Sequence, residues 1–278
     1  MSWEYGSKFF LHRHLVIEPN VGHKRRDAMN MRSLAAAAGI GFTILVAQDL
    51  AAEAAEVKVI GANPMKGVVK ELGSQFERES GHKLVTLYTG LRGIDAGEPF
   101  DVAILPTPGI ERLIKEGKII AATRADVAYA GIGVGVRAGA PKPDISSVET
   151  FKRALLSAKS VAHSREGTSG VHFKSLLERF GIVEEMKPKL KPLSGDALVQ
   201  AVPSGEAEMI VATISDIIAG GTALVGPLPS EVQFYNRFAA GVGANAKEAE
   251  AAKALIKFLT APAAVPVIKA KGMEPGAP

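Results

Sequence analysis

The chain has 278 residues, of which 47% are hydrophobic and 22% charged, and it contains no cysteine. This composition excludes a disordered or fibrous protein, and the lack of cysteine excludes disulfides, thiolate metal sites and iron–sulfur clusters. The formal net charge of +4 is too small and too scattered to indicate a nucleic-acid partner.

Residues 1–54 read as an upstream segment followed by a secretory signal peptide. Arg32 supplies a positive start, the apolar run over residues 34–46 is too short to span a bilayer, and Ala52-Glu53-Ala54 matches a cleavage pattern. We therefore expect a periplasmic protein that is mature from about Ala55. The alternatives are an uncleaved membrane anchor and an amphipathic core helix.

The basic stretch His23-Lys24-Arg25-Arg26 is unusual ahead of such a signal. Translation is therefore expected to start at Met29 or Met31, unless the signal has a very long basic region. The expected mature chain has 224 residues, no tryptophan, and 27 basic against 24 acidic residues, so its net charge is only +3.

After the signal, short strand-like runs alternate with amphipathic stretches, which is the pattern of an α/β fold. Several of these runs are continuously apolar, as is typical of strands buried on both faces. Strands are predicted over residues 57–61, 83–88, 101–105, 160–162, 190–193 and 208–212.

Apolar residues at helical spacing predict helices between these strands. The positions are Val68, Val69, Leu72 and Phe76, then Val171, Leu176, Leu177 and Phe180. Gly181 is expected to end the second helix, and Ser146-Ser147-Val148-Glu149 predicts a capping-box start for another. Residues 271–278 read as a surface tail.

Residues 129–136 and 238–244 are strand-like but rich in glycine. Glycine weakens a strand and permits bending, so two such segments fit paired crossings between two lobes. Close packing of a helix on a sheet inside one domain explains the glycines equally well.

The segment AHSREGTSG, residues 162–170, follows a predicted strand and opens a predicted helix. The free N–H groups at a helix start suit an anion, Thr168 and Ser169 add hydroxyl donors, and Gly170 permits close backbone approach. Arg165 fits a carboxylate held by two hydrogen bonds. The alternative is that Ser164 or Thr168 only caps the helix while Arg165 stays solvated.

Polar turns follow the first three predicted strands, where ligands bind in open α/β sheets. They contain Asn63, then Thr89 with Arg92, then Thr107. We expect these turns to share one pocket. For Asn63 a purely structural explanation also exists, since it can cap a helix that has Pro64 at its first position.

Catalytic signatures are weak. Ser169 has Gly167 two residues earlier, but Val171 stands where a nucleophile elbow needs a second glycine, and His163 and His172 show no triad pattern. The chain has no P-loop, and the glycines of residues 131–135 have the wrong spacing for a dinucleotide fingerprint. We expect no catalytic residue, no metal site and no organic cofactor.

Four segments carry a family resemblance: VKVIGANPMKGVVKEL, EPFDVAILPTP, SREGTSGVHF and DALVQAVPSGEAEMIVATISDI. Over residues 55–275 the chain resembles the periplasmic solute-binding proteins of ABC transporters, in their molybdate-binding branch. The resemblance implies an α/β, two-lobed type II fold, each lobe a mostly parallel sheet flanked by helices, with two crossover strands as hinge. The implied lobes are residues 55–133 plus 239–278, and residues 134–238.

The resemblance also implies ligand contacts. Asn63 lies where the family usually has a ligand-binding serine, and Thr89 falls in the loop that holds a second ligand-binding serine. Thr213 stands where the family commonly has a ligand-binding tyrosine. The expected ligand is therefore a small anion, either a molybdate-like oxyanion or, given Arg165 and the different residues at Asn63 and Thr213, a small organic carboxylate. The full expected set is Asn63, Thr89, Arg92, Thr107, Arg165, Thr168, Ser169, Gly170 and Thr213.

By resemblance the chain is expected to be a monomer that delivers a small anion to an ABC permease, without enzymatic activity. The alternative is a secreted aconitate isomerase, because the family also includes an isomerase of this kind that resembles a molybdate-binding protein. In that case Arg92 and Arg165 would hold a tricarboxylic acid, and His163 or Glu166 would act as the base.

Overall fold

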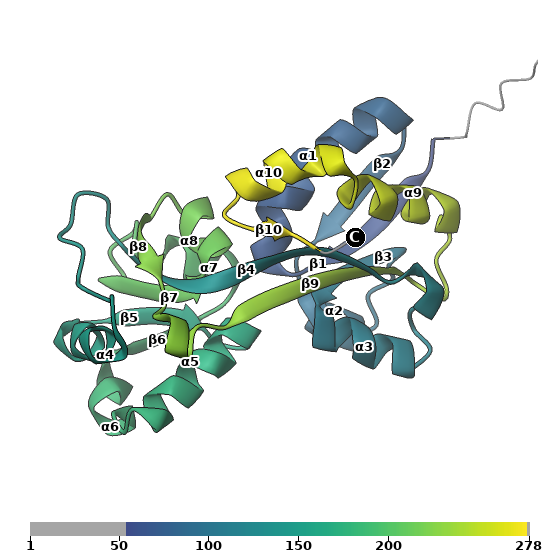
Figure 1. The fold of residues 1–278 in the computed structure, drawn as a ribbon. Coiled ribbons are helices and arrows are strands. Elements are labelled where there is room, and N and C mark those ends of the chain that lie inside the picture. Colours follow the sequence, from purple (N-terminus) through teal and green to yellow (C-terminus); the bar gives the residue numbers. More distant parts are fainter. Residues whose placement is uncertain (1–53, 277–278) are drawn as a thin grey trace, which may run out of the picture. The chain divides into compact units, whose positions relative to one another are not determined.

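The computed structural model describes residues 54–276, and the expected upstream segment and signal peptide lie outside this range. Figure 1 shows the described chain from purple to yellow. The first strands and helices are β1 (Glu56–Gly61), α1 (Lys66–Ser80), β2 (Lys83–Leu87), α2 (Gly90–Asp95), β3 (Val102–Pro106) and α3 (Thr107–Lys115). The long strand β4 (Ala125–Val136) follows.

The middle of the chain contains α4 (Val148–Ser157), β5 (Val161–Ser164), α5 (Thr168–Arg179), α6 (Val183–Met186), β6 (Leu190–Leu193), α7 (Gly195–Gln200), β7 (Met209–Thr213), α8 (Ile214–Ala219) and β8 (Ala223–Pro227). The chain returns through β9 (Tyr235–Val242), α9 (Ala249–Leu259), α10 (Val265–Ala270) and β10 (Glu274–Pro275). We call α4 to α8 with β5 to β8 the second lobe, and the elements before β4 and after β9 the first lobe.

The strands join in the order β2-β1-β3-β9-β4-β7-β5-β6, with β8 and β10 paired to β4. In the first lobe β1 runs parallel to β2 and β3, and in the second lobe β5 runs parallel to β6 and β7. The antiparallel pair β4 and β9 lies between the two parallel groups. The predicted α/β fold with two crossover strands is therefore confirmed.

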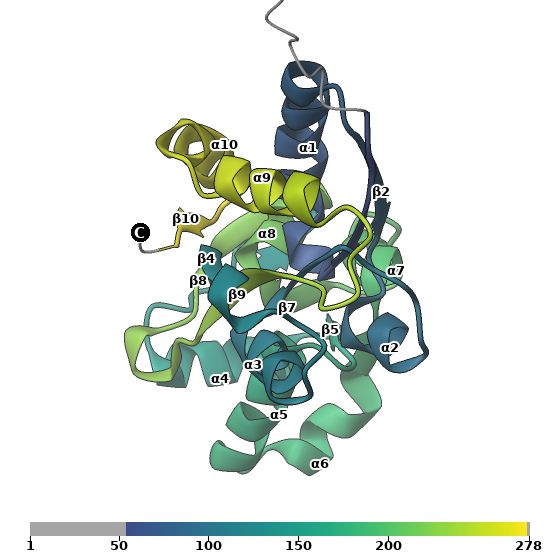
Figure 2. The ribbon, with the colours of Figure 1, turned by 90° about the vertical axis from the view of Figure 1, so that its right-hand side faces the viewer.

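Helices cover both faces of the first-lobe sheet, with α1, α9 and α10 on one face and α2 and α3 on the other (Figure 1). Figure 2 shows α9 and α10 following one another beside α1. Among residues 54–276 no single helix is long and apolar enough to cross a membrane, and α9 with α10 passes that test only as a pair bent by 59°.

The apolar residues form separate cores. One core contains residues of the first lobe and runs up to Ala130 and on from Phe238. Two further clusters contain residues between Ile132 and Val232, on the two faces of the second-lobe sheet. The chain thus changes core near residue 131 and again between residues 232 and 238, while the predicted lobe boundaries at 133/134 and 238/239 stay predictions.

The glycines of strand β4 fit both of the explanations given for them, a crossing between two lobes and close packing of a helix on a sheet. Its first part pairs with β9 and its second part with β7 and β8, so one strand passes from one lobe into the other. A Cβ at Gly133 would lie 2.9 Å from the Gly226 carbonyl oxygen, and one at Gly135 would lie 2.7 Å from Ile217 Cγ2. These glycines let β8 and α8 pack closely on the crossing strand.

Several local predictions differ from the structure by small amounts. The capping box of α4 is formed by Ser147 and Thr150, one residue later than expected, because the Ser147 hydroxyl accepts the Thr150 N–H. Val171 is 62% exposed although its spacing predicted an apolar face. The expected tail is partly ordered, since Glu274 and Pro275 pair with β4.

Candidate functional site

A cavity of about 490 Å³ lies where the carboxyl ends of strands from both lobes face one another. On the first lobe its walls come from the turns after β1, β2 and β3. On the second lobe they come from the turns after β5 and β6 and from α8, and β9 lines the cavity between the two lobes. We call this cavity the cleft; its polar side chains are Asn63, Tyr88, Thr89, Arg92, Arg112, Ser164, Glu166, Thr168, Ser169, Ser194, Asp216 and Asn236.

Asn63 lines the cleft and does not act as a helix cap. The chain after β1 forms a short 3-10 turn whose N-cap is Ala62, with no side-chain cap bond. The Asn63 Nδ2 atom instead donates to Asp216 Oδ1 of the second lobe at 3.1 Å. The capping explanation of Asn63 is therefore excluded, and its amide connects the two lobes.

Thr89, Arg92 and Arg112 line the first-lobe wall. The Thr89 hydroxyl donates to Glu98 at 2.7 Å, which holds the turn before α2. Arg112 pairs with Asp95, which with other contacts raises the pKa of its guanidinium, and its Nε atom has no hydrogen-bond partner among the described residues. Two guanidinium groups therefore border the cleft from this lobe.

On the second lobe the predicted turn before α5 forms part of the wall. The Ser164 hydroxyl accepts the Gly167 N–H at 2.9 Å, and the Thr168 hydroxyl donates to Asn236 Oδ1 of β9 at 2.6 Å. Ser169 is 4% exposed and also lines the cleft. The helix start with its hydroxyls thus faces the cavity, as the anion hypothesis expects.

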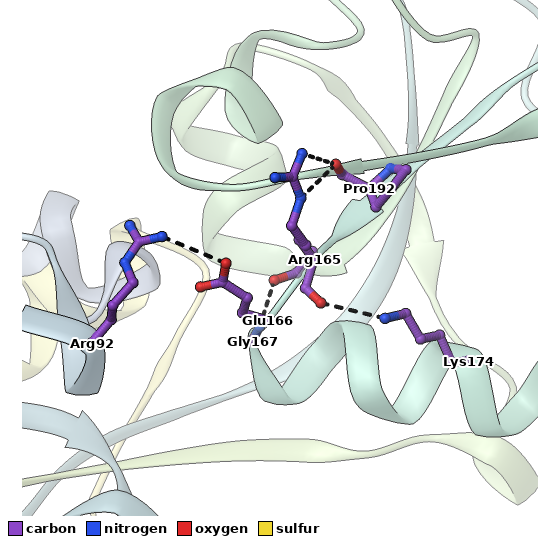
Figure 3. A network of polar contacts seen from close by, with 7 residues as sticks. Arg92, Arg165, Glu166, Gly167, Lys174 and Pro192 are labelled. Carbon is purple, nitrogen blue, oxygen red and sulfur yellow. Dashed lines mark hydrogen bonds and ion pairs between the residues drawn. The ribbon is translucent and has the colours of Figure 1, made fainter. Parts of the chain in front are cut away.

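Arg92 is the one expected guanidinium that reaches across the cleft. Its Nη1 atom lies 3.5 Å from Glu166 Oε1 of the second lobe. The two side chains are 71% and 53% exposed, so water screens this ion pair and it contributes little to stability. Figure 3 shows the two side chains pointing toward one another from opposite lobes.

Arg165 does not line the cleft. Its Nε and Nη2 atoms donate to the Pro192 carbonyl oxygen at 3.1 and 2.9 Å, and in Figure 3 the side chain turns away from Arg92 and Glu166. Its own backbone N–H donates to Leu193, which ties this turn to β6. A ligand contact by Arg165 would require the guanidinium to leave Pro192, so its predicted role stays a prediction.

Three other expected residues also lie outside the cleft lining. The Thr107 hydroxyl donates to the Arg237 carbonyl oxygen at 3.3 Å. Thr213 is fully buried, and its hydroxyl has no partner among the described residues. A Cβ at Gly170 would lie 1.8 Å from the Ser164 carbonyl oxygen, so this glycine lets α5 pack against the end of β5. Their ligand roles stay predictions.

Asp216 is the most perturbed acid of the cleft. It is 4% exposed, and burial raises the pKa of its carboxyl to about 7 while the Asn63 hydrogen bond partly opposes this. His163, by contrast, does not line the cleft. Its Nδ1 lies 2.9 Å from the Ser164 carbonyl oxygen, its ring packs on Phe173, and burial lowers its pKa.

Sequence reasoning missed Tyr88, Arg112, Ser194, Asp216 and Asn236. Ser194 and Asp216 follow the predicted strands that become β6 and β7, so the rule applied to the first three strands would have found both. Arg112 lies in the second turn of α3, and Asn236 lies within β9. These two reach the cleft through the tertiary fold, which no local pattern signals.

Residues 57–274 match the family model described as bacterial extracellular solute-binding protein. The chain belongs to this family. The solute-binding chain is 30% identical over 235 residues to the molybdate-binding protein of Azotobacter vinelandii, with 80% of this chain and 91% of that protein covered. It is 27% identical over 228 residues to an aconitate isomerase of a Pseudomonas species, covering 78% and 87%.

The solved structures agree on the fold. The periplasmic molybdate-binding protein of Azotobacter vinelandii matches with a TM-score of 0.66 and 20% identity, covering 78% of this chain and 98% of that one. The expected resemblance and the two-lobed type II fold are thereby confirmed. The protein is a solute-binding protein of the ABC-transporter kind, a family whose members bind small ligands and work with a permease.

Proposed function

We propose that this solute-binding protein captures a small organic carboxylate in the cleft and delivers it to an ABC permease. The observation that carries the proposal is the contact between Arg92 and Glu166, in which a guanidinium of one lobe faces a carboxylate of the other at 3.5 Å. Because that pair is long and exposed, a ligand carboxylate can replace Glu166 at little cost.

The remaining cleft donors support an anion. Thr168 and Ser169 lie at the start of α5, a helix of 12 residues whose first N–H groups lack helical partners. Arg112 adds a second guanidinium on the same wall as Arg92. A guanidinium group binds a planar carboxylate through two parallel hydrogen bonds. These two arginines therefore suit a carboxylate better than a tetrahedral oxyanion.

A ligand panel tests this proposal. Molybdate, tungstate, sulfate, phosphate, and di- and tricarboxylates are added to the mature chain at equal ionic strength, and the unfolding temperature is followed. We expect carboxylates to raise it with concentration and oxyanions to act more weakly. If no small anion shifts the unfolding temperature, the anion proposal is abandoned; if only oxyanions do, the carboxylate assignment is wrong.

Two arginine variants then show which guanidinium, that of Arg92 or that of Arg165, binds the ligand carboxylate. Arg92→Ala should weaken carboxylate binding about tenfold to a hundredfold, because a charge-assisted contact is lost. Arg165→Ala should have a much smaller effect, since its guanidinium is engaged by Pro192. Loss of binding in Arg165→Ala with normal binding in Arg92→Ala would reverse this assignment.

Asp216 favours a second candidate, an isomerase acting on an unsaturated tricarboxylic acid. A buried carboxyl whose pKa is raised to about 7 suits a base near neutral pH. It would take a proton from the carbon beside one carboxylate and return it to the far carbon of the original double bond, so the double bond moves by one position and no other reactant is consumed. Asp216 lines the cleft, whereas the earlier candidate His163 does not.

Incubation with trans-aconitate, followed by proton NMR, decides between the two candidates. Appearance of the cis isomer at a rate proportional to protein, with loss of the rate in Asp216→Asn, would establish the enzyme. Binding without any isomer over hours would leave transport as the function. We further infer that the chain is exported and cleaved before Ala55, which N-terminal sequencing of the secreted protein checks.

A further inference from the structure

A second cavity, of about 630 Å³, lies beside the cleft at the junction of the two lobes. The start of α1 and the end of α10 form its first-lobe wall, and α7 and α8 form its second-lobe wall (Figure 1). Asn63 and Asp216 line both cavities, so their hydrogen bond separates this one from the cleft. We call it the lysine pocket because Lys66, Lys70 and Lys271 line it.

Three lysines and two acids, Asp196 and Asp216, line the lysine pocket, so its lining carries an excess of positive charge. Lys66 pairs across the lobes with Asp196 at 2.7 Å, and Lys271 pairs with Glu71 at 2.6 Å. Lys70 has no ion pair among the described residues. Asp196, the one solvent-exposed carboxylate of the lining, is 72% exposed and leaves its partner accessible to other anions.

Close packing positions the ammonium group of Lys271 at the lysine pocket. A Cβ at Gly67 would lie 3.4 Å from Lys271 Cδ, so the missing side chain lets the Lys271 stem lie along the first turn of α1. Gly272, with φ of 72°, turns the chain immediately afterwards, close to Ile218 of α8. The end of α10 is therefore held near both α1 and α8.

Ser215 gives an independent indication of a ligand. It lines the lysine pocket, is 5% exposed, and its hydroxyl has no hydrogen-bond partner among the described residues. A buried hydroxyl without a partner costs folding free energy, and native proteins usually satisfy such groups with a neighbour, water or ligand. An oxygen atom bound among the lysines would accept from it.

We propose that the lysine pocket is a second anion site, which takes a small tetrahedral oxyanion of the phosphate or sulfate class. Ammonium groups are compact charges with three rotatable donors, so they match oxygens spread in three dimensions, unlike the guanidinium forks of the cleft. The anion would touch Lys70 and Lys271 of the first lobe and Ser215 of the second. Its binding would favour the arrangement in which the lobes are together.

Selenate and phosphate are the probes. Crystals soaked in selenate should give an anomalous selenium peak between Lys70, Lys271 and Ser215. In solution, phosphate binding measured by calorimetry at low salt should persist in the cleft variant Arg92→Ala. It should weaken about tenfold when Ser215→Ala and Lys70→Ala are added, and stay unchanged with the control Lys253→Ala on α9.

Folding is checked in the same variants. Ser215→Ala removes a hydroxyl with no partner to lose, so without phosphate its unfolding temperature should equal or exceed that of the parent. A selenium peak in the cleft alone, or phosphate binding that the Ser215 and Lys70 changes leave intact, would overturn the proposal. Phosphate binding that survives the Ser215 and Lys70 changes would leave carboxylate capture by the cleft untouched, whereas a selenium peak in the cleft would count against the carboxylate assignment as well.

Discussion

Asp216 shows how contact between the two lobes changes the chemistry of a single residue. Its carboxyl is removed from water between α8 and the turn after β1, and only the Asn63 amide compensates among the described residues. Burial penalises the charged form, which raises the pKa from an ordinary 3.8 to about 7. A group of this kind makes folding depend on pH.

The direction of that dependence follows from where the proton is held. Below about pH 4 the carboxyl is protonated in both the folded and the unfolded chain. Between about pH 4 and 7 only the folded chain retains the proton, so the free energy of unfolding falls as the pH rises. The full change corresponds to on the order of 4 kcal/mol.

Asp216→Asn tests this directly, because the amide keeps an acceptor for Asn63 and cannot titrate. The variant should gain stability relative to the parent between pH 4 and 8, measured as free energy of unfolding in urea. The control Asp144→Asn removes an exposed carboxyl whose pKa is lowered by the Ser146 N–H. Because this carboxyl is ionised in both the folded and the unfolded chain above about pH 5, the stability difference between this variant and the parent should not change with pH there. Equal pH slopes for Asp216→Asn and the parent would contradict the assignment.

Arg92 and Arg165 show that the direction of a single long side chain could not be predicted from the sequence. Both Arg92 and Arg165 follow strands at the expected place, and both were expected to hold a carboxylate. The structure directs Arg92 across the cleft and Arg165 onto the Pro192 carbonyl. A local sequence pattern fixes the position of a long side chain on the backbone but not the direction in which it lies.

At the scale of elements, α5 shows why the site needs a glycine. The first turn of this helix lies against the end of β5, and a Cβ at Gly170 would meet the Ser164 carbonyl oxygen at 1.8 Å. That contact involves backbone, so it cannot be relieved by a rotamer change. The packing in turn sets where Thr168 and Ser169 enter the cleft.

Gly170→Ala is therefore expected to destabilise the protein by about 3 kcal/mol and to weaken ligand binding as α5 shifts. Gly226→Ala in β8 is the matched control, because its Cβ would meet only Ile145 Cδ1 at 3.7 Å, an ordinary contact. Urea unfolding of both variants provides the comparison. A Gly170→Ala protein as stable as the Gly226→Ala protein would contradict this role.

Elements were predictable where burial controls composition. The strands that become β3 and β7 are almost wholly apolar because helices cover both faces of the sheet. β8, which is only partly buried, and β10, which has two residues, carry no such pattern and were missed. The glycines of β4 pointed to a crossing strand, although their spacing also reflects the packing of α8.

In the molecule as a whole, three side-chain contacts within residues 54–276 join the lobes: Asn63 to Asp216, Lys66 to Asp196, and Arg92 to Glu166. The first is a single hydrogen bond and the other two are exposed ion pairs, so they hold the lobes together weakly. A ligand that contacts both walls of the cleft adds further contacts between the lobes and so stabilises the arrangement in which they are together. A solute-binding protein closes on its solute in this way.

Calorimetric titration of the mature chain with di- and tricarboxylates measures carboxylate capture by the cleft directly. The control variant is Arg179→Ala, an exposed arginine at the end of α5 that does not line the cleft. We predict saturable binding of one carboxylate per chain, at least tenfold weaker in Arg92→Ala and unchanged in Arg179→Ala. Absence of carboxylate binding, or equal affinity in the parent and Arg92→Ala proteins, would contradict the account.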